Sequence, residues 1–170
     1  PAAVGLCLLA KPITHLLVAP QYYLGYRIIP LVAFGAFFVG VAHRFTPPLT
    51  YYKRTDLLMF CYLGSVVLNI VLNFVFIPKY GYMAAAGTTF VSYAFLLLSA
   101  IFVSRRFFVW EFPFKSLAKA ASASGVMAVV IYPVGNSITA SPLINLIIAV
   151  FLGAAVYLVA LFLLKEIRPE

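Results

Sequence analysis

Two basic side chains lie inside an apolar stretch near the start of the chain, where charge is costly. Lys11 and His15 are four residues apart, so a helix places them on one face, one turn apart. Pro12 removes the backbone donor for the carbonyl of Leu8 and is expected to kink that helix. A kinked helix with a cationic stripe is suited to line a water-filled cavity that receives an anion. Lys11 and His15 are therefore the substrate-cavity candidates.

A second interpretation of the same two residues stays open. The long lysine side chain can reach a nearby membrane interface with its ammonium group, while its methylene groups stay in the apolar region. In that case Lys11 would only mark the depth of the helix, and His15 would bond to a neighbouring carbonyl group.

Polar side chains also form a stripe further along the chain. Asn69 and Asn73 are four residues apart, and Ser65 precedes them by one turn. In a membrane, such side chains usually bond between neighbouring helices, at about 0.6 to 2 kcal/mol each. The stripe is therefore predicted to join two helices, with a position on a substrate pathway as the alternative.

Carboxylates and catalytic motifs are missing from the apolar stretches. The four acidic residues lie at their edges or in the tail: Asp56, Glu111, Glu166 and Glu170. A proton or sodium relay needs acidic groups within the membrane, and a cavity for cationic compounds would favour them. No GxSxG, HExxH or Walker A motif is present. We expect no enzymatic activity, no metal site and no cofactor.

The composition is that of a membrane protein. Hydrophobic residues make up 65% of the chain and charged residues 9%, whereas soluble domains are about a quarter charged. The net charge of +8 comes from basic residues that are divided among several loops, so we do not expect nucleic acid as a partner. The chain opens with Pro1 inside an apolar stretch, which suggests a piece of a longer protein.

The apolar residues predict an all-α integral membrane protein with about six transmembrane helices. A helix needs about 20 residues, at about 1.5 Å per residue, to cross the hydrocarbon core. The predicted spans are residues 4–19, 28–42, 57–77, 83–103, 118–134 and 143–164. The whole chain, residues 1–170, is taken as one such bundle.

The connection between the third and fourth spans is predicted to be a tight hairpin. Pro78 is expected to end one helix, and Gly81 permits the positive φ of a reversal. The small residues 84–87 that follow would let another helix approach closely.

Basic residues predict the orientation of the spans. Segments 43–56, 104–119 and 165–170 hold nine of them: Arg44, Lys53, Arg54, Arg105, Arg106, Lys115, Lys119, Lys165 and Arg168. The loops on the other side hold Arg27 and Lys79. Because cytoplasmic loops carry an excess of Lys and Arg, the nine residues and the C-terminus are expected in the cytoplasm.

The stretch LNIVLNFVFIPKYGYMAAAGTTFVSYAFLLL, residues 68–98, resembles a signature of the C-terminal half of polysaccharide flippases of the O-antigen type. These belong to the multidrug/oligosaccharidyl-lipid/polysaccharide exporter superfamily. The matching positions are Asn69, Asn73, Pro78, Gly81, Ala85, Ala86, Thr88, Ser92 and Tyr93. The frequent Gly-Lys of the family's cytoplasmic loop is replaced here by Tyr52 and Lys53.

The resemblance implies one lobe of a two-lobed exporter in the cytoplasmic (inner) membrane of a bacterium. Such a protein flips a polyprenyl-pyrophosphate-linked oligosaccharide by alternating access, for the biosynthesis of lipopolysaccharide or other surface polysaccharides. Its implied partners are this lipid-linked substrate, membrane lipids and the N-terminal lobe of the same chain. Basic residues of the family's cavity meet the lipid phosphate, and Lys11 is the position here that could do so.

Two other classes of protein remain as alternatives. A drug or metabolite exporter of the same superfamily is the main alternative, and it would need acidic residues inside the spans of the missing lobe. A membrane polymerase or ligase for the same glycans would need a large external loop, and the external loops predicted here are short.

Overall fold

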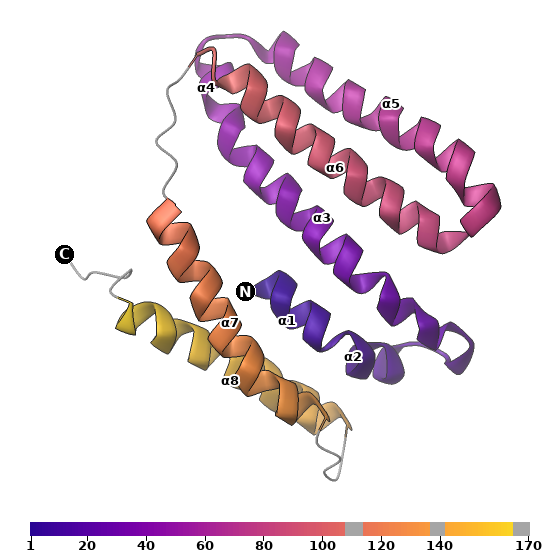
Figure 1. Cartoon of the computed structure of the whole chain (residues 1–170), viewed down its shortest axis with the longest axis vertical. Helices are drawn as coiled ribbons and strands as arrows, with labels where there is room; N and C mark the ends of the chain where they lie inside the picture. The colour runs from indigo at the N-terminus through magenta and orange to yellow at the C-terminus, as the bar shows by residue number, and fades with distance from the viewer. Residues whose placement is uncertain (108–113, 137–141, 165–170) are drawn as a thin grey trace. The chain divides into compact units, whose positions relative to one another are not determined.

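The computed structural model describes residues 1–107, 114–136 and 142–164. Within these residues the chain is helical and contains no strand. The elements in chain order (Figure 1) are α1 (Ala2–Leu8), α2 (Ala10–Leu17), the 3₁₀ helix η1 (Pro20–Arg27), α3 (Ile29–Ala42), the 3₁₀ helix η2 (His43–Phe45), α4 (Thr46–Tyr51), α5 (Thr55–Tyr80), α6 (Tyr82–Ser104), α7 (Phe114–Asn136) and α8 (Pro142–Leu163).

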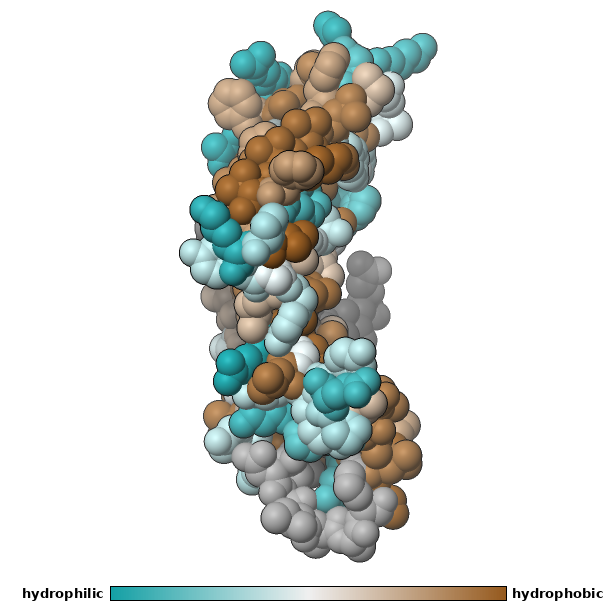
Figure 2. All heavy atoms as spheres, turned by 90° about the vertical axis from the view of Figure 1, so that its right-hand side faces the viewer, coloured by the Kyte–Doolittle hydropathy of each residue, from teal (hydrophilic) through white to brown (hydrophobic). Residues whose placement is uncertain are grey.

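Five helical segments of the described residues are long and apolar enough to cross a membrane. They are Ile29–Tyr51, which joins α3, η2 and α4, then Thr55–Tyr80, Tyr82–Ser104, Ser116–Pro133 and Leu143–Leu163. Large hydrophobic side chains cover their outer surfaces; Phe74, for example, is 86% exposed. Figure 2 shows such residues over broad areas of the face that it presents. A multi-pass membrane protein is the arrangement that these helices indicate.

The first predicted span, residues 4–19, is not one long helix. The segment forms α1 and α2, which are separated at Leu9, where φ is −90° and ψ is 5°. Pro12 is the physical reason, because it offers no N–H to the carbonyl of Leu8 and its ring crowds that carbonyl. The kink expected from Pro12 is therefore present, but the sequence overestimated the continuity of the helix. Among the described residues, five spans are found where six were expected.

The chain divides into two compact units. The first unit comprises Pro1–Pro30 and Phe112–Glu170, and the second unit comprises Leu31–Glu111. The single six-helix lobe stays a prediction.

Antiparallel packing of α5 and α6 forms the main body of the second unit. The predicted hairpin is confirmed, with Gly81 at φ 61° between the two helices. Pro78, however, does not end α5, which continues to Tyr80. One proline in the last turn removes only one backbone bond, and the N–H of Gly81 closes the helix on the carbonyl of Ile77, with an N···O distance of 2.8 Å.

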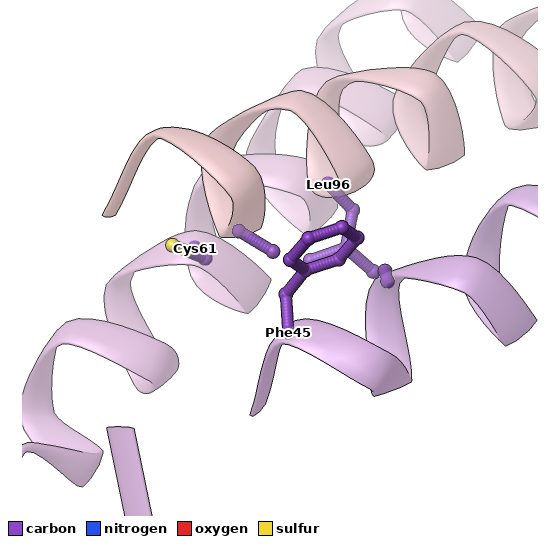
Figure 3. Packing of buried hydrophobic residues seen from close by; sticks show 5 residues of the cluster. Phe45, Cys61 and Leu96 are labelled. Carbon is purple, nitrogen blue, oxygen red and sulfur yellow. The ribbon is translucent and has the colours of Figure 1, made fainter. Parts of the chain in front are cut away.

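A small apolar core holds the opposite end of this hairpin to the end of the α3 segment. It consists of Ala42, Phe45, Cys61, Leu96 and Ala100. Figure 3 shows the ring of Phe45 directed toward Leu96, with Cys61 of α5 beside them. Small residues at this contact let the helices approach closely, as membrane helices require.

The first unit is held together by contacts of α1 and α2 with α7 and α8. Leu9, Met127, Ile131 and Ala149 form its buried core. Gly153 has no side chain at the point where Ile131 reaches α8, and a Cβ there would overlap with Ile131. The break at Leu9 is thus packed against α7 and α8 within this core.

Candidate functional site

The 3₁₀ helix η1 folds back along α2 and supplies aromatic rings to it. Val18 and Ala19 are extended, so the chain reverses before Pro20 begins η1. Lys11 of α2 meets Tyr26 of η1, whereas the later residue His15 meets the earlier residue Tyr23. The pairing order shows that α2 and η1 run in opposite directions. Each of the two basic residues of α2 therefore faces one tyrosine.

Two cations meet at the ring of Tyr26. The ammonium nitrogen of Lys11 lies 5.4 Å from the ring centroid, and the guanidinium carbon of Arg27 lies 5.9 Å from it. Arg27 also donates a long hydrogen bond, 3.5 Å from Nε to the phenol oxygen of Tyr26. This bond, together with the charges of Arg27 and Lys11, lowers the pKa of Tyr26 below its ordinary value of 10. Tyr26 is thus the group that brings both cations to one place.

A pocket of about 310 Å³ opens at these cations. Its described lining comprises Cys7, Leu8, Ala10, Lys11, Pro12, Tyr26, Arg27, Pro30, Ile131 and Tyr132. None of these residues is acidic, so the pocket carries positive charge on a largely apolar wall. Lys11 and Arg27 themselves are exposed at its edge. The pocket is chemically suited to a small anionic group.

His15 lies outside this lining. Its imidazole stacks on the ring of Tyr23, with a centroid separation of 4.2 Å and an interplanar angle of 10°. The structure therefore brings Lys11 to the pocket and places His15 one turn further along α2, against an aromatic ring.

The asparagine stripe lies in the second unit and bonds toward α6. Asn69 Nδ2 donates to Thr89 Oγ1 at 3.5 Å, and Asn73 Nδ2 donates to Asn69 Oδ1 at 3.0 Å. The hydroxyl of Thr88 donates in turn to Asn73 Oδ1. One turn before the asparagines, Ser65 Oγ donates to the carbonyl of Ser92 at 2.7 Å.

These bonds form one network, which we call the α5–α6 ladder. It comprises Ser65, Asn69, Asn73, Thr88, Thr89 and Ser92. The side chains of both asparagines form hydrogen bonds with each other and with threonine side chains of α6. This geometry is that of a helix-to-helix connection.

Basic residues also gather at one end of the second unit. His43 and Arg44 of η2, and Lys53 and Arg54 before α5, lie on the same side of the hairpin as Arg105 and Arg106 after α6, because η2 and α4 contact α6. The rings of Tyr52 and Phe107 are 5.7 Å apart, which links the two segments directly. Lys79 lies at the other end of α5. This unit therefore has one strongly basic end. The basic residues of segment 165–170, which are also predicted to be cytoplasmic, lie outside the described residues.

Sequence reasoning did not select Tyr26 and Arg27 as site residues. Arg27 was noted only as a basic residue outside the predicted cytoplasmic segments. One signal was available: the segment between Pro20 and Pro30 contains three tyrosines and one arginine directly after the lysine-bearing helix. Its return onto α2 could not be read from spacing alone.

No group of three or more His, Cys, Asp or Glu suited to a metal ion occurs among the residues that the structure covers. Comparison of the chain with family models, with curated proteins and with solved structures found no match.

Proposed function

We propose that this chain is part of a flippase that moves a polyprenyl-pyrophosphate-linked oligosaccharide across the cytoplasmic membrane. The observation that carries the proposal is the meeting of Lys11 and Arg27 at Tyr26, in a pocket that has no acidic residue among its described lining residues. The signature-like residues 68–98 support the same conclusion from the sequence.

The chemistry of the pocket fits a pyrophosphate. Arg27 offers a planar fork of donors that matches phosphate oxygens, and Lys11 adds a compact positive charge. Two unit charges about 4 Å apart interact with about 4 kcal/mol at an effective dielectric of about 20, before the cost of desolvation is subtracted. Two cations acting together can therefore hold a pyrophosphate and still release it, as a transporter must.

We propose that the pocket lies at the outer side of the membrane. The span Ile29–Tyr51 begins two residues after Arg27, and its other end lies within the basic segment 43–54. If that basic segment is cytoplasmic by the positive-inside rule, η1 and its pocket are external, and the predicted C-terminus is cytoplasmic. The pocket would then hold the pyrophosphate while the transporter is open to the outside.

We propose transport rather than catalysis because the described lining of the pocket provides positive charge and an apolar surface, which suit binding of an anion. Export of a drug or of another metabolite is the second candidate within the same superfamily. An anionic metabolite would use the same cations, so the two candidates differ in the requirement for a lipid chain.

The test is export of surface glycan by the full-length protein. We expect Lys11→Ala to abolish or strongly reduce export at normal membrane insertion, and Lys11→Arg to retain part of it because the charge stays. Lys79→Ala is the matched control, since it removes a lysine from the hairpin tip, away from the pocket lining. Parental export by Lys11→Ala at equal expression would leave Lys11 as a residue that only reaches the interface.

A further inference from the structure

Three membrane-crossing segments of the second unit have ends that lie close together. These ends are at Tyr51, Thr55 and Ser104. Contacts of α4 with α5 and with α6 bring them to the same end of the unit (Figure 1). The rings of Tyr52 and Phe107, 5.7 Å apart, join the turn before α5 to the residues after α6. The two connecting segments therefore form one surface.

Four cations lie on this surface and define what we call the basic surface: Lys53, Arg54, Arg105 and Arg106, all of them exposed. Asp56 is the only acidic residue among those that the structure describes, and its Oδ2 lies 3.9 Å from Nη1 of Arg54. Both partners of this pair are exposed, so it contributes little free energy. Within the described part of the chain, the positive charge of the basic surface is therefore largely uncompensated.

Lys53 has a backbone conformation that residues with a side chain rarely adopt. Its φ is 56°, and no other described residue except glycine has a positive φ. The N–H groups of Lys53 and Arg54 donate to the carbonyls of Thr50 and Leu49, at 3.0 and 2.8 Å, and so close the end of α4. Glycine usually occupies this closing position because it takes a positive φ without strain. A lysine there costs stability, and strained residues of this kind cluster at sites that bind ligands.

Aromatic side chains indicate that the basic surface lies at the depth of the lipid headgroups. Tyr51 is 83% exposed and Tyr52 is 52% exposed, at the end of a membrane-crossing segment. Tyrosines at such ends lie at the headgroup level of a membrane. The guanidinium carbon of Arg106 lies 5.4 Å from the ring centroid of Phe102, so this cation stays beside α6. Phospholipid phosphates at the same depth are the nearest anions to the four cations.

We propose that the basic surface binds the phosphate of an anionic phospholipid of the surrounding membrane. Its charge and its depth both select this occupant. A zwitterionic lipid such as phosphatidylcholine carries its own positive group and should bind more weakly. Each Lys or Arg near a membrane surface strengthens association with anionic lipid about fivefold. This site lies in the second unit, and it does not depend on the proposed function.

The test measures the dissociation constant of the first phospholipid that binds to the full-length protein in neutral detergent, by native mass spectrometry. Phosphatidylglycerol should bind at least about fivefold more tightly than phosphatidylcholine. Lys53→Gln should weaken binding of phosphatidylglycerol about fivefold and should leave phosphatidylcholine unchanged. Replacing both Arg105 and Arg106 by glutamine should weaken it at least about tenfold. Lys79→Gln is the matched control, since it removes the same charge from the other end of α5.

Lys53→Gly separates binding of lipid from stability of the fold. Glycine takes a φ of 56° without strain, so the thermal midpoint in neutral detergent should equal or exceed that of the parent. Binding of phosphatidylglycerol should nevertheless fall about as much as in Lys53→Gln. A lower thermal midpoint with parental binding of phosphatidylglycerol would show that Lys53 serves the fold alone, and would overturn the lipid site.

Two further results would also contradict the proposal. If Lys79→Gln weakens binding of phosphatidylglycerol as much as Lys53→Gln does, the lipid responds to charge at either end of α5 and no defined site exists. If soluble glycerol phosphate binds as tightly as phosphatidylglycerol and competes with it, the ligand of the basic surface is a soluble anion. Either result leaves the pocket at Lys11 and Arg27, and the function proposed for it, unaffected.

Discussion

The two units of this chain treat their polar side chains in opposite ways. In the second unit, Asn69 and Asn73 are bonded to each other and to α6, and no described residue of that unit lines the pocket at Lys11. In the first unit, Lys11 and Arg27 lie over an aromatic ring at the edge of a pocket. Polar groups that satisfy one another stabilise a helix pair, whereas charges at a pocket can contribute to the binding of a ligand. The comparison shows a structural connection in the second unit, and the proposed function places substrate binding in the first.

The orientation of the second unit can be tested by an all-or-none measurement. In a background without Cys7 and Cys61, single cysteines at positions 80 and 52 mark the opposite ends of α5. We expect position 80 to react with an impermeant thiol reagent in intact cells, and position 52 to react only after permeabilisation, because the positive-inside rule predicts that the basic end is cytoplasmic. Reaction of position 52 in intact cells would reverse the orientation and would move the pocket to the cytoplasmic side.

Arg27→Ala should have the next largest effect. Removing the guanidinium takes away one of the two cations at Tyr26, so export of glycan should fall at least about tenfold at equal expression. Arg27→Lys should recover part of the activity, since the charge remains and the planar fork does not. Unchanged export by Arg27→Ala would show that Lys11 does not act with Arg27. The proposal of a two-cation site in the first unit would then be wrong.

Loss of the α5–α6 ladder should affect stability instead. Replacing both Asn69 and Asn73 by leucine should lower the free energy of unfolding in detergent by about 1 to 4 kcal/mol, while protein that remains folded still transports. Ile70→Leu is the control, because Ile70 is 60% exposed and lies on the same helix. Thermal unfolding and export are measured together. A fully stable double variant without export would place the asparagines on the substrate path. The structural role assigned to the second unit would then be wrong.

Gly81→Ala should have the smallest effect. The residue has φ 61° and ψ −146°, a conformation that residues with a Cβ rarely adopt, although the space around it is open. We expect a loss of about 1 to 3 kcal/mol in unfolding free energy, read as a lower thermal midpoint, with export retained. No loss would mean that the hairpin tip relaxes freely and that the helix pair does not depend on it.

Local chemistry explains which parts of the fold were predictable. The spans that became α5, α6 and α8 were correctly located because long apolar runs have no other stable conformation in a membrane. The hairpin at Gly81 was correctly located for a similar reason, since only glycine suits that backbone. The extent of α5 past Pro78 was missed, because the remaining bonds of the last turn compensate for the one that proline removes.

Only part of the candidate site could be predicted from the sequence. Lys11 was singled out because a charge within an apolar run is rare, and the structure places it in the lining of a pocket. Its companions were not, because η1 resembles an interfacial loop and its return onto α2 depends on the reversal at Val18 and Ala19. His15, chosen by its spacing from Lys11, lies against Tyr23 and outside the pocket lining.

The sequence by itself determined that this protein is helical and crosses a membrane several times, where its main hairpin turns, and that one helix near its start bends. These properties follow from composition, from runs of about 20 apolar residues and from single prolines and glycines, all of which act over a few residues. The tertiary structure alone decided that Arg27 joins Lys11 at Tyr26 and that α1 and α2 pack on α7 and α8. The first feature depends on the return of η1 onto α2, and the second on contacts between segments far apart in the chain, such as Leu9 with Ile131. Both are set by packing rather than by local preference.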